Sequence, residues 1–261
     1  MPNKKGHANM RQYTILLFVI ACLSVSGSIT ASNLSDSLEV KFRLGYNIGG
    51  TAPIGIPATI RSIDGYRLTP SFMAGVDASV KINKRWGLSA GIRIENKAMD
   101  ADLTTKSYRI EVVKGDSKLL GNYTGNISLE VREWMFTVPV CATFHASRKV
   151  TLKAGPYVSV LINSGFSGIA FDGYLREGNP TGPKYLIGNV EGERTTFDFD
   201  ADMRRMQFGL AAGVDWNLGS RIGLSADFNW GLTRVFKSDF KAMDQSLFPL
   251  FATIGIFYTI K

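Results

Sequence analysis

The stretch that decides the fold is RIGLSADFNWGLT, residues 221–233. Its even-numbered residues, from Ile222 to Leu232, are all apolar, whereas the odd-numbered ones include Ser225 and Asp227. A period of two is typical of a β-strand with two unlike faces. The run also exceeds the about 9–11 residues that a tilted strand needs to cross a bilayer. It therefore predicts a membrane-spanning strand.

Seven further segments alternate in the same way, and the last is less regular because Phe251 and Phe257 fall on its polar face. They lie near residues 38–49, 69–82, 86–96, 130–145, 150–163, 206–218 and 250–260. Eight is an even number, as expected of single-chain bacterial outer-membrane barrels.

The connections between these segments alternate in length. Short turns at 83–85, 145–149 and 219–220 alternate with long polar connections near 50–68, 97–129, 164–202 and 235–248. Outer-membrane barrels have short periplasmic turns and long external loops. We therefore predict an all-β fold: an eight-stranded, antiparallel, up-and-down transmembrane β-barrel of the outer-membrane type.

The N-terminal residues have the pattern of an export signal. Basic residues precede a short apolar run, and a small residue, Ala31, suits cleavage. We predict a cleaved signal peptide at 1–31, a barrel domain at 32–261 and an outer-membrane location. A retained helix would need about 20 apolar residues, and lipidation at Cys22 fits poorly because the apolar run continues past it.

Alternation alone does not say which face meets lipid, but the tryptophans do. All four lie on the apolar face, two beside short turns and two beside long connections. Indole rings prefer the headgroup level of a membrane. We predict an aromatic girdle of Trp86 and Trp216 at the periplasmic rim and Trp134 and Trp230 at the outer rim. The alternative is four ordinary core tryptophans.

The opposite face is rich in glycine and carries charges of both signs. We expect a charged network in the lumen of Arg43, Asp77, Arg93, Glu95, Glu133, Lys153, Asp215 and Asp227. Buried charges need partners, and the interior of an eight-stranded barrel is only wide enough for side chains to fill. A rigid polar plug is favoured over an ion pathway.

The chain resembles the PorT-like outer-membrane β-barrel proteins of the Bacteroidota. The resemblance rests on KFRLGYNIGG at 41–50, on WMFTVPV at 134–140 and on AGPYV at 154–158. It covers nearly the whole mature chain and implies the fold more firmly than a role. One member of that family belongs to a secretion system, so a secretion or assembly component is an alternative function.

We expect a non-enzymatic barrel whose external loops bind a surface ligand or an envelope protein. An outer-membrane enzyme is the weaker alternative, since His145 is the one histidine after the signal and lies in a predicted periplasmic turn. We predict no cofactor, and the modest positive charge left after signal removal does not indicate nucleic-acid binding. Asp198, Asp200 and Asp202 suit either a calcium site or the solvated face of a strand.

Overall fold

The computed structural model describes residues 38–53, 55, 57–67, 69–114, 117–243 and 245–260. The predicted signal peptide at 1–31 lies outside this part of the chain. The barrel belongs to the compact unit Glu39–Lys261. Among the described residues, no helix is long and apolar enough to cross a membrane.

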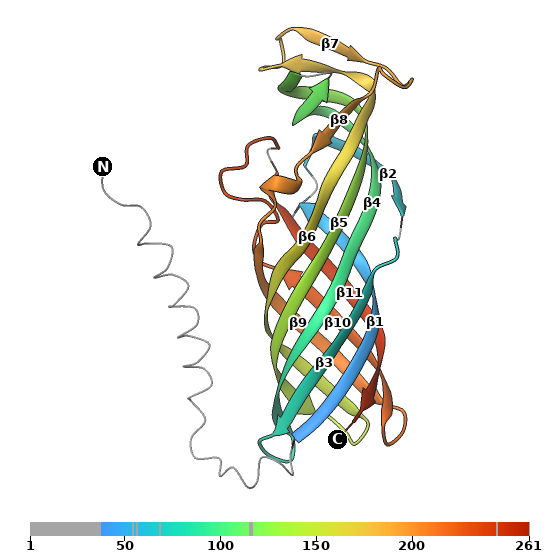
Figure 1. Ribbon diagram of the computed structural model, residues 1–261, viewed down its shortest axis with the longest axis vertical. Coiled ribbons are helices and arrows are strands. Elements are labelled where there is room, and N and C mark those ends of the chain that lie inside the picture. Colours follow the sequence, from blue (N-terminus) through green and yellow to red (C-terminus); the bar gives the residue numbers. More distant parts are fainter. Residues whose placement is uncertain are drawn as a thin grey trace, which may run out of the picture. The chain divides into compact units, whose positions relative to one another are not determined.

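Eight antiparallel strands form a closed ring, and hydrogen bonds between β4 and β5 complete it (Figure 1). The strands, in their order around the ring, are β1 (Leu38–Pro53), β11 (Leu247–Thr259), β10 (Ile222–Gly231), β9 (Met206–Asn217), β6 (Val150–Glu177), β5 (Ser117–His145), β4 (Trp86–Lys114) and β3 (Phe72–Lys81). The predicted eight-stranded up-and-down barrel is confirmed.

The two faces of each strand in the lower barrel have opposite character. On β10, Leu224 and Phe228 are exposed, whereas Ser225 and Asp227 are buried in the lumen. Phe251 and Phe257 of β11, which broke the sequence pattern, are buried as well. The apolar side chains therefore form an outward band around the barrel, and the polar ones fill its interior.

Three of the four predicted external loops are wrong in part, because much of their length is strand. β4 continues to Lys114 and β5 starts at Ser117, so residues 97–114 and 117–129 pair as the two arms of a long hairpin. β6 runs to Glu177 and thus occupies the first third of 164–202. Figure 1 shows β4, β5 and β6 passing well beyond the other ring strands. The projecting parts are residues 97–114 of β4, 117–133 of β5 and 164–177 of β6, which lie above the level of Asn96, Trp134 and Asn163. We call these parts the external extension.

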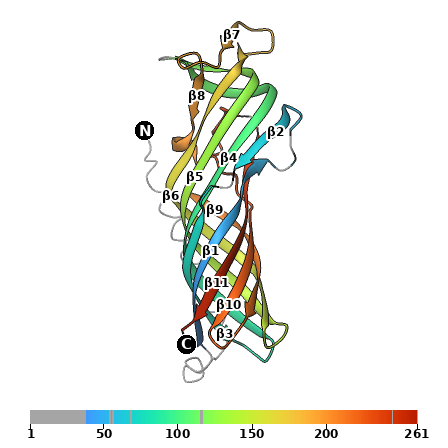
Figure 2. The same cartoon turned by 90° about the vertical axis from the view of Figure 1, so that its right-hand side faces the viewer.

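Three short strands complete the external extension. β2 (Ile60–Arg67) pairs with β4, β7 (Lys184–Ile187) pairs with β6, and β8 (Thr195–Asp198) pairs with both β4 and β6. β2 lies within the predicted loop 50–68, and β7 and β8 lie within 164–202. Figure 2 shows β2 beside the upper end of β1.

The alternation pattern reverses where the strands leave the outward apolar band. On β5, even-numbered residues such as Trp134 and Phe136 point outward below this level. Above it the apolar residues are odd-numbered, and Ile127 and Val131 are buried on the inner side. Outside a membrane the outer face meets water, so apolar side chains turn inward to form a core. The reversal marks the outer boundary of the membrane band.

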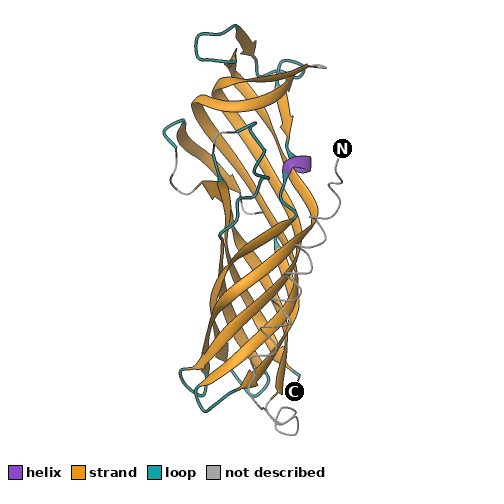
Figure 3. Ribbon diagram, turned by 90° about the vertical axis from the view of Figure 1, so that its left-hand side faces the viewer, coloured by secondary structure: helices purple, strands orange, loops and turns teal. Residues whose placement is uncertain are grey.

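That second core has its own apolar packing. Phe166 from β6, Phe197 from β8 and Phe236 from the β10–β11 connection are among its members, together with Ile110 and Tyr123 of the hairpin. The Phe166 and Phe236 rings lie edge to face, with centroids 4.8 Å apart. Figure 3 shows the short helix η1 (Asp200–Asp202) beside the strands of the extension. The β10–β11 connection meets the hairpin at a bridge between Met243 and Ile110. The extension is therefore a folded structure above the barrel.

Candidate functional site

A closed ring of alternating charges occupies the lower lumen. Its six members, which we call the charged ring, come from six different strands. In order they are Arg43 (β1), Asp77 (β3), Arg93 (β4), Asp227 (β10), Lys153 (β6) and Asp215 (β9). The six side chains are all buried.

Distances around the charged ring are those of close ion pairs. Arg43 donates to both carboxylate oxygens of Asp215, at 2.8 and 2.5 Å, and its Nε lies 2.5 Å from Asp77. Arg93 lies 3.1 Å from Asp77 and 3.2 Å from Asp227. Lys153 Nζ closes the circuit, 2.8 Å from Asp227 and 3.0 Å from Asp215. Each charge thus faces two of the opposite sign, which offsets the cost of removing it from water.

The remaining two predicted lumen charges lie higher, beside a lysine that the sequence analysis did not single out. Glu95 Oε2 lies 2.8 Å from Lys97 Nζ and accepts a hydrogen bond from the Thr137 hydroxyl at 3.3 Å. Glu133 is fully buried, and neither of its carboxylate oxygens has a hydrogen-bond partner among the described residues. The eight predicted residues therefore form two groups rather than one network.

Aromatic rings fill the lumen between the charges. Lys41 lies 4.7 Å from the centre of the Phe257 ring, and Lys97 lies 5.4 Å from that of Phe251. The cavity beside Arg43 and Asp215 holds only about 10 Å³, which is close to the volume of a single water-sized probe. At the level of the charged ring the lumen thus has little room for a solute.

The four predicted girdle tryptophans are all on the outside of the barrel, between 42% and 51% exposed. Trp86 opens β4 just after the turn at 83–85, and Trp216 is next to last in β9. Trp134 pairs with Asn96 where the outer face of β5 becomes polar, and Trp230 pairs with Leu250 near the outer end of β10. Their height along the strands matches the two rims, and their contact with headgroups remains a prediction.

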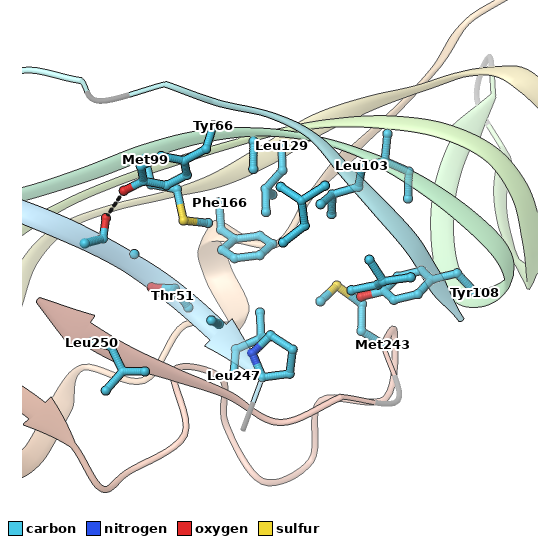
Figure 4. A pocket seen from close by; sticks show the side chains of 18 of the residues that line it. Thr51, Tyr66, Met99, Leu103, Tyr108, Leu129, Phe166, Met243, Leu247 and Leu250 are labelled. Carbon is cyan, nitrogen blue, oxygen red and sulfur yellow. Dashed lines mark hydrogen bonds between the residues drawn. The ribbon is translucent and has the colours of Figure 1, made fainter. Parts of the chain in front are cut away.

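An apolar cavity of about 450 Å³ lies above the charged groups, where the barrel meets the external extension. Its walls include Met99 and Leu103 of β4, Leu129 of β5, Phe166 of β6 and Leu247 of β11 (Figure 4). Its lining contains no charged side chain among the residues that the structure describes. The volume falls in the range of about 300–1,000 Å³ typical of small-molecule sites. Sequence reasoning missed this cavity.

The cavity lies behind a seam between two strands. β1 pairs with β11 as far as Pro53, but in the described sheet β2 pairs with β4 and not with β1. The Tyr66 hydroxyl of β2 donates a hydrogen bond to the Gly49 carbonyl of β1 across this seam (Figure 4). Ile63 and Tyr66, at the edge of the cavity, are 56% and 46% exposed. The seam is the side of the cavity that faces the outside.

The aspartates of the β8 region do not gather around one point. Among the described residues, no group of three or more His, Cys, Asp or Glu side chains is arranged to hold a metal. Asp198 ends β8 on its exposed side, and the Asp200 carboxylate accepts the backbone N–H of Phe166. Burial raises the pKa of Asp200, which opposes cation binding there. The predicted solvated strand face fits Asp198, whereas Asp200 begins the short helix η1.

The sequence matches the family described as outer membrane protein beta-barrel domain over residues 30–237. The chain belongs to this family. The match covers the first seven ring strands and most of the external extension, so it establishes an outer-membrane β-barrel. No curated protein matches the chain.

Several solved structures are similar to this barrel at low sequence identity. Ail of Yersinia pestis, solved with the heparin analogue sucrose octasulfate, shares 10% identity with a TM-score of 0.38, over 86% of this chain and 99% of its own. Neisserial surface protein A shares 10% with a TM-score of 0.34, over 85% and 96%. The translocator domain of the autotransporter NalP from Neisseria meningitidis shares 13% with a TM-score of 0.22, over 97% and 95%. We draw no functional conclusion from likenesses at this level.

Proposed function

We propose that this protein is a non-enzymatic outer-membrane barrel that binds a surface ligand or an envelope partner through its external extension. The observation that carries the proposal is the reversal of the apolar pattern at Asn96 and Trp134, beyond which the strands build a second core. A barrel that served only as a membrane anchor would have no use for this projecting structure. Binding sites on outer surfaces are commonly held by such rigid scaffolds.

The charged ring supports a sealed barrel rather than a channel. In this proposal it acts as a plug, because each of its charges is engaged by two others and the space beside them is about 10 Å³. The proposal includes a cleaved signal peptide at 1–31 and the PorT-like relationship in the Bacteroidota. The alternative form of the proposal is that the protein is a component of a secretion complex, and only the PorT-like relationship suggests it.

Two measurements test this proposal. Purified protein in a planar bilayer should give no large, steady conductance. A variant with the hairpin shortened above the Thr104–Asn126 pair should still migrate as a folded barrel in unheated gels. Chemical crosslinking in intact envelopes, followed by purification, should recover a partner with the full-length protein and lose it with the shortened one. Porin-like openings, or identical crosslinks from both proteins, would contradict the proposal.

A further inference from the structure

The apolar cavity lies at the height of the outer membrane surface, as the strand register shows. Gly50 of β1 pairs with Leu250 of β11, which pairs in turn with Trp230 of β10. Gly50 and Leu250 line the cavity, and Trp230 belongs to the predicted outer girdle. A ligand in this cavity would therefore be level with the boundary between headgroups and hydrocarbon.

The cavity wall is continuous with the lipid-facing surface. Ile48 and Leu250 lie on the outward side of their strands, in the same rows as the apolar band below them, and both also line the cavity. The wall then passes the seam at Gly49 and Tyr66 and reaches the buried side chains of Ile110 and Phe166. An apolar surface thus leads from the bilayer through the seam to the inner side of the extension.

At the edge of the cavity, Met99 packs directly against Gly50. A Cβ atom added to Gly50 would lie 2.4 Å from the sulfur of Met99 and 3.8 Å from the Tyr66 ring. Any larger side chain at position 50 would therefore have to displace Met99, which lines the cavity. Only one hydrogen bond, from Tyr66 to Gly49, is described across the seam itself. Among the described residues, no strand ladder joins β1 to β2 at this seam.

We propose that this cavity binds the hydrocarbon chain of an outer-leaflet amphiphile, which enters sideways between β1 and β2. The lining offers apolar contacts and no charge among the described residues, so it suits an acyl chain, while the ligand's polar head stays at the headgroup level outside the seam. The inference names a ligand class for the external extension and so rests on the proposed function. The charged groups below form a polar floor that an acyl chain does not enter.

Photolabelling of the full-length protein in phospholipid vesicles tests the inference. The probes are palmitic acid and phosphatidylethanolamine, each with a diazirine near the end of its acyl chain, in separate arms that distinguish a free fatty acid from a membrane lipid. We expect adducts on Met99, Leu103 or Ile110 with at least one probe, and unlabelled palmitate or lipid should abolish them. Adducts on Leu224 of the lipid-facing band should persist under the same competition.

A matched pair of variants checks the location. Ala101→Phe adds a ring to the cavity wall, whereas Ala226→Phe adds the same ring to the lipid-facing side of β10. Ala101→Phe should weaken probe binding about tenfold, the change expected when roughly two methylenes lose their apolar contacts. Ala226→Phe should leave it unchanged. If Ala101→Phe does not fold, Gly50→Leu at the entrance provides the same test.

Two results would overturn the inference. One is labelling confined to the lipid-facing band, and the other is cavity labelling that excess unlabelled palmitate and lipid leave unchanged. Either result could occur in a protein that gives no conductance and keeps its envelope crosslinks. It would then contradict the acyl-chain ligand but not the proposed function.

Discussion

Replacing Asp215 by asparagine gives the most direct test of the charged ring. The Asp215 carboxylate accepts two hydrogen bonds from Arg43 and lies 3.0 Å from Lys153 and 3.5 Å from Lys41. Asparagine keeps the shape but removes the charge, so three buried cations lose a partner at once. Each retains another: Arg43 keeps Asp77, Lys153 keeps Asp227 and Lys41 keeps Glu39.

The expected loss of stability follows from the number of counter-ions that each cation keeps. Removing one member of a buried ion pair costs about 3–5 kcal/mol when its partner is left uncompensated. Because every cation here keeps one carboxylate, we expect Asp215→Asn to lower the free energy of unfolding by about 3 kcal/mol, the lower end of that range. Urea-driven unfolding in phospholipid vesicles, followed by tryptophan fluorescence, measures the change.

The control is the same substitution at an exposed aspartate, Asp239→Asn in the β10–β11 connection, which should change stability by less than about 0.5 kcal/mol. Adding Arg43→Gln to Asp215→Asn should cost less than the sum of the two single changes, since contacting residues couple. If Asp215→Asn unfolds at the same urea concentration as Asp239→Asn, the charged ring has no role in stability and the reasoning fails.

Three other predictions follow from the fold. Leu224→Lys, on the lipid-facing side of β10, should destabilise the protein in vesicles by about 2–4 kcal/mol. Val190→Lys, at an exposed apolar position in the external extension, should not destabilise it. Equal losses of stability would contradict the assignment of the lower barrel to the membrane. Gly213→Ala should lower the free energy of unfolding by about 1–3 kcal/mol through overpacking, because the added Cβ would lie 2.0 Å from the Asp227 carboxylate. The Cβ of Gly219→Ala would meet nothing within 4 Å, so this control should leave the unfolding midpoint unchanged. Trypsin added to intact cells should cut at the exposed Arg194 and spare the turn at 83–85, and the opposite pattern would invert the topology.

The lower barrel was predictable because its signal is local. Strict alternation separates the two faces of each strand, and the alternating connection lengths separate the two ends of the barrel, so all eight ring strands were found. The extra length of β4 and β5 was missed although the sequence contains its signal. The apolar residues change from Ile92 and Ile94 to Met99 and Leu103, a change of parity within one strand.

The pairing of charges was beyond sequence reasoning for a different reason. Alternation gives the face of a residue but not its height, and height depends on the register between neighbouring strands. Glu95 and Glu133 therefore could not be separated from the charged ring, and Lys97 went unnoticed beside them. The apolar cavity depends on where β2 leaves the barrel wall, which no pattern in 50–68 indicates.

The charged ring also has a consequence for assembly. Each of its six strands supplies one charge, and a slip of one residue in any strand would turn that charge from the lumen to the lipid. The misaligned barrel would then expose one ion to hydrocarbon and leave its two neighbours in the charged ring with one counter-ion each instead of two. The charged ring can therefore close only when all six strands have paired with their neighbours in the correct register, although these strands lie far apart in the sequence.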